Sequence, residues 1–147
     1  MIGDTDSGSV LDRRVRVLLA DDHRLFLNAL QVALANVEWI EVVGCAENGE
    51  QAIELVGSLS PDIVLMDIAM PVLDGIEATR QIRERYPASA VVILTGTSGG
   101  EGDVLAHQAG ASGFVQKTND LPDLVGSILA LATLAARRGG ESGPILH

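Results

Sequence analysis

Ile63-Val64-Leu65-Met66-Asp67 is a run of four apolar residues that ends in a single carboxylate. Four apolar residues in a row leave no polar face, which predicts a strand that is buried on both sides. The run Val91-Val92-Ile93-Leu94 has the same character, and residues 15–20 form a short apolar run that ends in Asp21-Asp22. Strands of this kind are typical of a parallel sheet with helices on both faces, so we expect an α/β fold.

Helical patterns separate the expected strands. The first helix would bury Phe26, Leu30, Ala33, Leu34 and Val37, which recur at helical spacing. The expected strands are 15–20, 40–45, 62–67, 90–95 and 112–116, and the expected helices are 23–37, 48–59, 75–86, 101–109 and 121–137. Parallel strands need crossover connections, and these are right-handed. Five rounds of strand and helix therefore predict a doubly wound, five-stranded parallel sheet.

Length and composition indicate one globular domain. The chain has 147 residues, of which 47% are hydrophobic and 20% charged. Its formal net charge is −10, which argues against binding to nucleic acid or to an anionic membrane surface. Cys45 is the single cysteine, so no intrachain disulfide can form, and a cytoplasmic location fits. The start lacks a signal peptide, and the uncharged stretches 25–37 and 124–136 fall short of the roughly 20 residues that cross a bilayer.

The ends of the chain differ in composition from its middle. Residues 1–14 are polar and are expected to form a flexible leader, residues 15–137 the domain, and residues 138–147 the start of a linker. The last helix has a core stripe of Leu124, Val125, Ile128 and Ala132. It also carries Leu131 and Leu134, which leaves two readings open: a frayed end, or a contact face for a homodimer or an output domain.

Polar side chains stand where the expected strands end. Asp21 and Asp22 follow the first strand, Asp67 the third, Thr95 the fourth and Lys117 the fifth. In open α/β sheets, function lies at the carboxyl ends of the strands, so these side chains are expected to meet on one rim. Lys117 is the only lysine in the chain. Three carboxylates, one hydroxyl and one ammonium would then share a site.

Such a site has a specific chemistry. Carboxylates about 5 Å apart repel by roughly 3 kcal/mol per pair at an effective dielectric near 20, and a divalent cation such as Mg²⁺ relieves the repulsion. A carboxylate beside the ion can attack a phosphoryl group and form an aspartyl phosphate. A lysine neutralises charge on the transferring group, and a hydroxyl can donate to its oxygens.

Each residue taken alone also has a structural explanation. Asp21 or Asp22 could cap the first helix, and Asp67 could begin a turn. Thr95 could be an ordinary strand residue and Lys117 a solvated surface lysine. His23, beside the acids, is expected at the surface rather than as a metal ligand. The functional hypothesis rests on all these positions falling on one edge of the sheet.

Four segments resemble the receiver domain of bacterial two-component response regulators over residues 15–137. They are Leu18-Leu19-Ala20-Asp21-Asp22-His23, the stretch 64–75 (VLMDIAMPVLDG), Val92-Ile93-Leu94-Thr95, and the stretch 109–117 (AGASGFVQK). The resemblance implies a flavodoxin-like sheet of order 2-1-3-4-5 and no enzyme activity beyond the domain's own phosphorylation and dephosphorylation. It also implies a sensor histidine kinase as partner and Mg²⁺ as cofactor.

The resemblance further implies a role for each matched residue. Asp67 would be the phosphoacceptor. Asp22 would bind Mg²⁺ directly, Asp21 largely through water, and Ala69 through its backbone carbonyl. The remaining matched positions would stabilise the phosphoryl group (Lys117) or form the switch pair (Thr95 and Phe114). In this pair, Thr95 would move toward the phosphoryl group and open space for Phe114, assisted by the glycine-rich loop 96–100.

The sequence departs from the general family pattern in ways that point to a subgroup. Thr118 stands where many receivers have proline, which resembles the NarL/LuxR-type regulators. The tail 141–147 resembles the start of a linker to a DNA-binding output domain, so we expect control of transcription through a domain outside this chain. Gly96, Ala69 and Phe114, which lacks a tyrosine hydroxyl, leave open a phosphorylation-independent interaction module or a stand-alone receiver. A small hydrolase is disfavoured, because Ala69 stands where a second acid would be needed.

Overall fold

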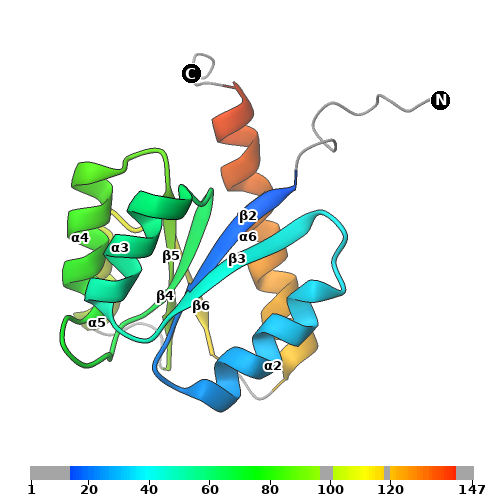
Figure 1. Ribbon diagram of the computed structural model, residues 1–147, viewed down its shortest axis with the longest axis horizontal. Helices are drawn as coiled ribbons and strands as arrows, with labels where there is room; N and C mark the ends of the chain where they lie inside the picture. The colour runs from blue at the N-terminus through cyan, green and yellow to red at the C-terminus, as the bar shows by residue number, and fades with distance from the viewer. Residues whose placement is uncertain (1–13, 97–100, 118–119, 142–147) are drawn as a thin grey trace.

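The computed structural model describes residues 14–96, 101–117 and 120–141 (Figure 1). Its sheet has five strands, all parallel, in the order β3-β2-β4-β5-β6. Along the chain they are β2 (Val15–Ala20), β3 (Ile40–Ala46), β4 (Ile63–Asp67), β5 (Ala90–Thr95) and β6 (Gly113–Gln116). The order corresponds to 2-1-3-4-5 when strands are counted from the first, which confirms the expected fold class.

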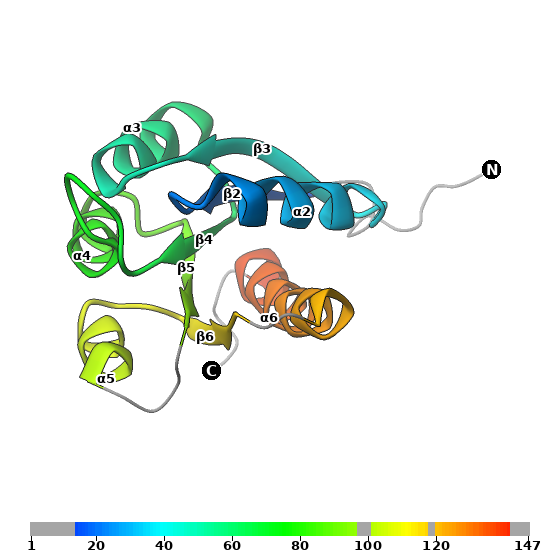
Figure 2. The ribbon, with the colours of Figure 1, turned by 90° about the horizontal axis from the view of Figure 1, so that it is seen from below.

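Among the described residues, five helices cover the two faces of the sheet (Figure 2). They are α2 (Arg24–Ala35), α3 (Gly49–Leu59), α4 (Gly75–Arg85), α5 (Glu101–Gln108) and α6 (Leu121–Glu141). Helices α2 and α6 pack on one face, and α3, α4 and α5 on the other. The arrangement is the doubly wound one that alternating strands and helices predict.

Strand β4 shows why the apolar runs form the centre of the sheet. All five of its residues are buried. Ile63 and Leu65 belong to the core beneath α2 and α6, whereas Val64 and Met66 belong to the core beneath α3, α4 and α5. Successive side chains of a strand point to opposite faces, so a strand covered on both sides must be apolar at every position. The same division into two cores extends through β2 and β5.

Side-chain caps define the starts of two helices. The Asn48 carboxamide oxygen accepts a hydrogen bond of 2.8 Å from the Gln51 amide at the start of α3. The Asp74 carboxylate accepts one of 2.9 Å from the Glu77 amide at the start of α4. Both bonds satisfy amides that the helix itself leaves without a partner. His23 occupies the corresponding position before α2, but its side chain makes no capping bond.

The structure corrects three expectations about the helices. In α2 the buried residues are Leu27, Leu30 and Leu34, whereas the expected Phe26 and Ala33, and Val37 just after the helix, are only partly buried. Helix α6 continues to Glu141 instead of ending at Arg137. Leu131 of α6 belongs to the packed side of the helix, because it is partly buried against the core. Its side chain lies so close to Gly113 that a Cβ atom added there would be 3.2 Å from it. Leu134, by contrast, is half exposed.

Some expectations concern residues outside the described ranges. These are the leader up to residue 13, positions 97–100 of the glycine-rich loop, Thr118 and the tail 142–147. Within the described part of the chain, Trp39 is partly buried against the core and His107 is exposed. No helix among the described residues has the length and apolar character that spanning a membrane would require.

Candidate functional site

Parallel pairing brings the ends of four strands to one edge of the sheet. Asp21 follows β2 directly, and its amide donates to the Ala46 carbonyl of β3 over 3.0 Å. Asp67 is the last residue of β4 and pairs with Leu94 of β5. The Lys117 amide, just after β6, donates to the Thr95 carbonyl over 2.7 Å. The edge is therefore built by backbone hydrogen bonds between residues far apart in the sequence.

Lys117 lies between two buried carboxylates at this edge. Its Nζ atom is 2.6 Å from Oδ2 of Asp21 and 3.3 Å from Oδ1 of Asp67. Asp21 is fully buried, Asp67 is 5% exposed, and the Lys117 side chain is 18% exposed. Charges this well shielded from water interact much more strongly than surface pairs do. The sequence-predicted cluster of these three residues is thus present in space.

The carboxylates carry more negative charge than the described residues around them neutralise. Among the described residues, none donates a hydrogen bond to the buried Oδ2 of Asp67, and none donates one of acceptable geometry to Oδ2 of Asp21, although the ammonium is near. Desolvation, together with the negative charge of Asp21, raises the pKa of Asp67, although Lys117 opposes the shift. A buried, partnerless carboxylate oxygen is costly, and this cost indicates that the site is shaped for a cationic or electrophilic ligand.

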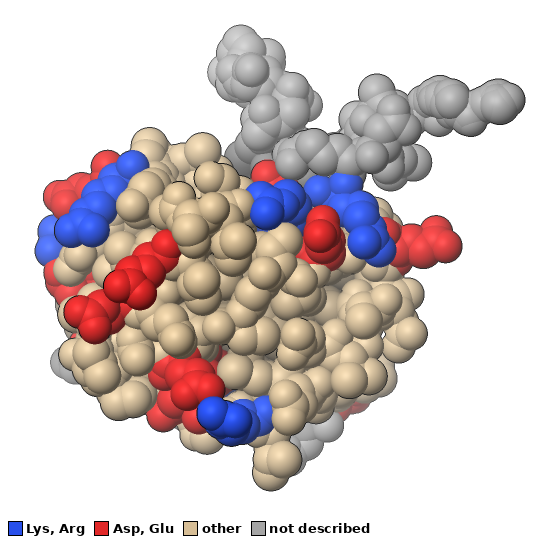
Figure 3. Space-filling view, in the orientation of Figure 1, with Lys and Arg blue, Asp and Glu red and all other residues tan. Residues whose placement is uncertain are grey.

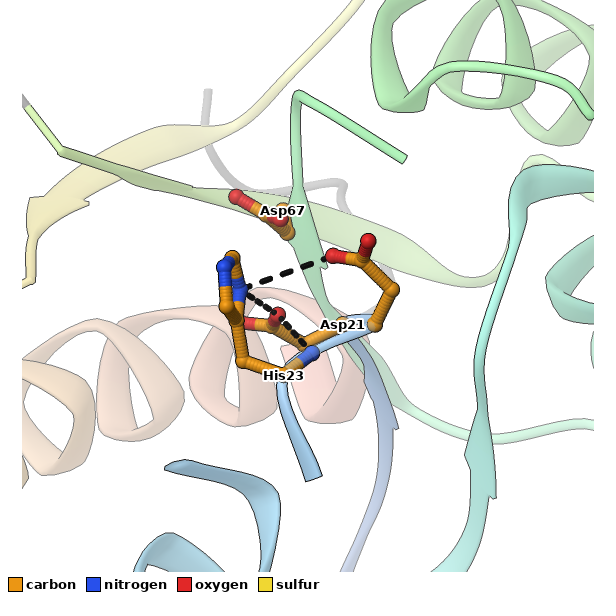
Figure 4. A group of neighbouring side chains, drawn as sticks. Asp21, His23 and Asp67 are labelled. Carbon is orange, nitrogen blue, oxygen red and sulfur yellow. Dashed lines mark hydrogen bonds and ion pairs between the residues drawn. The ribbon is translucent and has the colours of Figure 1, made fainter. Parts of the chain in front are cut away.

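His23 joins the site, which the sequence reasoning did not expect. Its Nδ1 atom lies 2.9 Å from Oδ1 of Asp21 and 3.5 Å from Oδ1 of Asp22, although the side chain is 65% exposed (Figure 4). Its amide also donates to Oδ1 of Asp21 over 2.9 Å. The hydrogen bond with Asp21 is the main reason why the pKa of His23 lies above its ordinary value. Its place directly after two acids was the available signal.

Four side chains could together hold a metal ion. Asp21, Asp22, His23 and Asp67 each offer one ligand atom, and these atoms lie within 4.8 Å of one another. Three of the four donors are carboxylate oxygens, the ligands that Mg²⁺ prefers, and the partnerless Oδ2 of Asp67 is available for a further bond. The donor set therefore fits Mg²⁺. Ala69 lies two residues beyond Asp67, exposed in the turn after β4.

The turn after Asp67 is held tightly in place. A Cβ atom on Gly75 would lie 1.9 Å from the Asp67 carbonyl oxygen, so only glycine fits at the start of α4. The Gly75 amide also donates to the Ile68 carbonyl over 2.8 Å. Within this turn Val72 has φ of 70°, a left-handed conformation that is strained for a β-branched residue. Close packing thus fixes the backbone that carries the Asp67 carboxylate.

Thr95 and Phe114 lie on neighbouring strands, on the same side of the sheet. Thr95 is 6% exposed at the end of β5, and Phe114 of β6 pairs with Ile93. Ile93 and Phe114 both belong to the core beneath α3, α4 and α5, and Thr95, two residues after Ile93, faces the same way. A movement of the Thr95 side chain could therefore alter the packing around Phe114.

A pocket of about 930 Å³ opens beside the carboxylate cluster and is lined in part by His23, Phe26 and Lys117. Phe26 is a second residue that the sequence reasoning did not associate with the site.

On the face of the molecule drawn in Figure 3, Lys and Arg form separate groups near the margins, and most of the middle carries no charged side chain.

Residues 17–129 match the family model of the response regulator receiver domain. The chain is 36% identical over 123 residues to the transcriptional regulatory protein DegU of Brevibacillus brevis, covering 84% of this chain and 52% of that protein. It is 36% identical over 109 residues to the nitrate/nitrite response regulator protein NarL of Escherichia coli (strain K12), covering 74% and 50%. The chain thus spans about half the length of the curated relatives it matches.

A solved structure shows the same likeness in three dimensions. The crystal structure of a two-component response regulator of the LuxR family, from Aurantimonas sp. SI85-9A1, superposes with a TM-score of 0.75 at 32% identity. The match covers 88% of this chain and 97% of that one.

Proposed function

The chain belongs to the response regulator receiver domain family of two-component systems, in its NarL/LuxR-type branch, and we propose that Asp67 is its phosphoacceptor. One observation carries this proposal. The Asp67 carboxylate ends a central strand, has Lys117 beside one oxygen, and keeps its other oxygen buried with no hydrogen-bond partner in the described part of the chain. A nucleophilic carboxylate needs a free lone pair and a nearby positive charge, and Asp67 has both.

Asp67 would receive the phosphoryl group from a phosphohistidine of a sensor histidine kinase. An oxygen of Asp67 forms the new bond to phosphorus, the bond from phosphorus to the histidine nitrogen breaks, and the electron pair returns to the imidazole. Lys117, 3.3 Å from Oδ1 of Asp67, is placed to contact the phosphoryl oxygens once they are attached there. Catalysis of this kind depends on positioning and charge neutralisation, which the rigid strand ends supply.

Mg²⁺ is the cofactor that the donor set fits. Asp22, Asp67 and the backbone carbonyl of Ala69 would hold the ion, with Asp21 and His23 completing its surroundings. When bound, the ion supplies positive charge that neutralises the carboxylates and the transferring phosphoryl group. Burial, followed by the negative charge of Asp21, raises the pKa of Asp67, and this supports the assignment because a cation would favour the ionised carboxylate.

The response would pass from Asp67 to the neighbouring strands. A phosphoryl group on Asp67 adds negative charge and acceptor oxygens next to the end of β5, and Thr95 would donate to them. Phe114, on the same side of the sheet, would repack as Thr95 moves. The outcome is a shift in the population of two packings and not a new fold.

The output would be transcriptional, through a DNA-binding domain that lies outside this chain. DegU is by name a transcriptional regulatory protein, and the chain spans about half of its length. Helix α6, where Leu134 is 50% exposed, is the surface we assign to contact with an output domain or a second receiver.

Intact-protein mass spectrometry tests the proposal. Incubation with acetyl phosphate or phosphoramidate and Mg²⁺ should add about 80 Da, the mass of one phosphoryl group. Asp67→Asn should abolish the gain, and so should EDTA. Glu54→Gln, which removes one exposed carboxylate on α3, serves as the control and should be phosphorylated normally. A gain that survives Asp67→Asn would disprove the assignment. Normal partner binding by Asp67→Asn would favour a phosphorylation-independent module instead.

A further inference from the structure

The Lys117 ammonium has a third neighbour, which comes from helix α2. Its Nζ atom lies 4.7 Å from the centroid of the Phe26 ring. This distance is within the range in which the negative face of an aromatic ring attracts a cation. Phe26 is itself partly buried against the core beneath α2 and α6, so the ring is anchored. One ammonium thus contacts two carboxylates and one aromatic face.

The neighbouring pocket offers the Lys117 side chain a second orientation, away from the carboxylates. The pocket of about 930 Å³ is open to water and is lined by both Phe26 and Lys117. A lysine has a flexible four-carbon stem and a strongly hydrated head, so it could turn into this pocket and leave Asp67. The Phe26 ring lies beside the ammonium, 4.7 Å from Nζ to the ring centroid, and attracts it to its present position. The ring therefore favours the orientation in which Lys117 faces the carboxylates.

We propose that Phe26 is a positioning residue: its ring face binds the Lys117 ammonium and keeps it directed at Asp67. The inference rests on the proposed function of Asp67, because it concerns how the Lys117 ammonium is oriented to contact a phosphoryl group on Asp67. The ring acts through its electron-rich face, so size and hydrophobicity alone do not replace it. Tyr and Trp should preserve the effect, whereas Leu, which is apolar and packs well, should lose it.

Nuclear magnetic resonance tests the contact directly, because Lys117 is the only lysine in the chain. Protein labelled only at lysine gives a single set of side-chain signals. The ε-protons of Lys117 should resonate upfield of their free position because of the ring current of Phe26. Phe26→Leu should remove this shift, and Phe26→Tyr should retain it. Leu25→Ala, at a neighbouring residue that is 86% exposed, is the control and should leave the shift unchanged. An unchanged shift in Phe26→Leu would overturn the proposal.

Binding of beryllofluoride, a mimic of the phosphoryl group, tests the function of the contact. With Mg²⁺ present, Phe26→Leu should bind beryllofluoride about three- to tenfold more weakly, the range of a partly desolvated cation–π contact. Its affinity for Mg²⁺ alone should not change, since Lys117 is not a metal ligand. In a Lys117→Met background, Phe26→Leu should have no further effect. Equal losses in both backgrounds would mean that the ring acts by packing alone, which would overturn the proposal.

The two measurements separate this inference from the proposed function. If the wild-type protein binds no beryllofluoride, the assignment of Asp67 fails, while the lysine signals still decide whether the ring holds the ammonium. If beryllofluoride binds and Phe26→Leu binds it equally well, the assignment of Asp67 stands and the role of Phe26 is disproved. Thermal unfolding of Phe26→Leu and Phe26→Tyr shows whether both variants are folded before they are compared.

Discussion

Lys117 lies closer to Asp21 than to the candidate phosphoacceptor: its Nζ atom is 2.6 Å from Oδ2 of Asp21. The distance to Oδ1 of Asp67 is 3.3 Å. The fully buried Asp21 therefore anchors the ammonium, and Asp67 shares it more loosely. A phosphoryl group on Asp67 would bring new anionic oxygens to the side on which Lys117 is held less tightly.

Removing the ammonium should destabilise the domain. Lys117→Met leaves Asp21 and Asp67 buried without a cationic side chain between them. We expect the free energy of unfolding to fall by about 2–4 kcal/mol, since breaking one partner of a buried pair leaves an uncompensated charge. Urea unfolding in EDTA measures the change. Addition of Mg²⁺ should restore part of the loss, and an unchanged unfolding midpoint would contradict the role of Lys117 as the central cation.

Asp67→Asn should stabilise the metal-free protein near neutral pH. The pKa of Asp67 is raised above its ordinary value of 3.8, mainly by desolvation. The folded state therefore favours the protonated acid, and the stability that protonation gives is complete below pH 3.8 and lost as the pH rises through the raised pKa. An uncharged Asn avoids this loss. Chemical unfolding in EDTA should show the benefit at pH 7 and its disappearance below pH 3.8; a benefit independent of pH would contradict this explanation.

Mg²⁺ should stabilise the folded protein, because the ligand cluster exists only when β2 and β4 are paired. At a concentration 100 times the dissociation constant, the gain should be about 2.7 kcal/mol. Thermal unfolding with and without Mg²⁺ measures it. Asp22→Asn should greatly reduce the gain, while Glu54→Gln on α3 should keep it. Equal gains in both variants would mean that the ion binds elsewhere.

Gly75→Ala should be poorly tolerated, whereas Gly126→Ala should be beneficial. A Cβ atom on Gly75 would meet the Asp67 carbonyl at 1.9 Å, but one on Gly126 of α6 would meet nothing within 4 Å. We expect Gly75→Ala to cost about 3 kcal/mol or more and Gly126→Ala to add up to about 1 kcal/mol, because Ala favours helix over Gly. Urea unfolding of both variants compares them. Similar effects of the two changes would refute the close approach at Gly75.

Val72→Asn should raise stability. Val72 has φ of 70° and is 75% exposed, so its side chain contributes little packing while its backbone is strained. Asn adopts this conformation more readily, and we expect a gain of about 0.5–1 kcal/mol. Thermal unfolding provides the measurement. A loss of stability would show that the valine side chain makes packing contacts that outweigh the strain.

The sequence by itself determined the strands and the residues at their ends. The apolar runs of β4 and β5 can be buried only in a sheet covered on both faces, and the polar residues that follow them must then lie at one edge. The expected helices 48–59 and 75–86 also begin within one residue of α3 and α4, whose starts Asn48 and Asp74 cap through contacts three residues away. The apolar runs and the helix starts could be predicted because each depends on residues that are close together in the sequence.

Tertiary structure decided which side of α2 is buried and which further residues belong to the site. Leu27 is buried and Phe26 only partly buried, because the way α2 lies on the sheet decides which of its apolar residues face the core. The contacts of His23 with Asp21 and of Phe26 with Lys117 likewise depend on side-chain direction. Phe26 and Lys117 come from α2 and the end of β6, and a linear pattern carries no information about the angle at which two such elements meet.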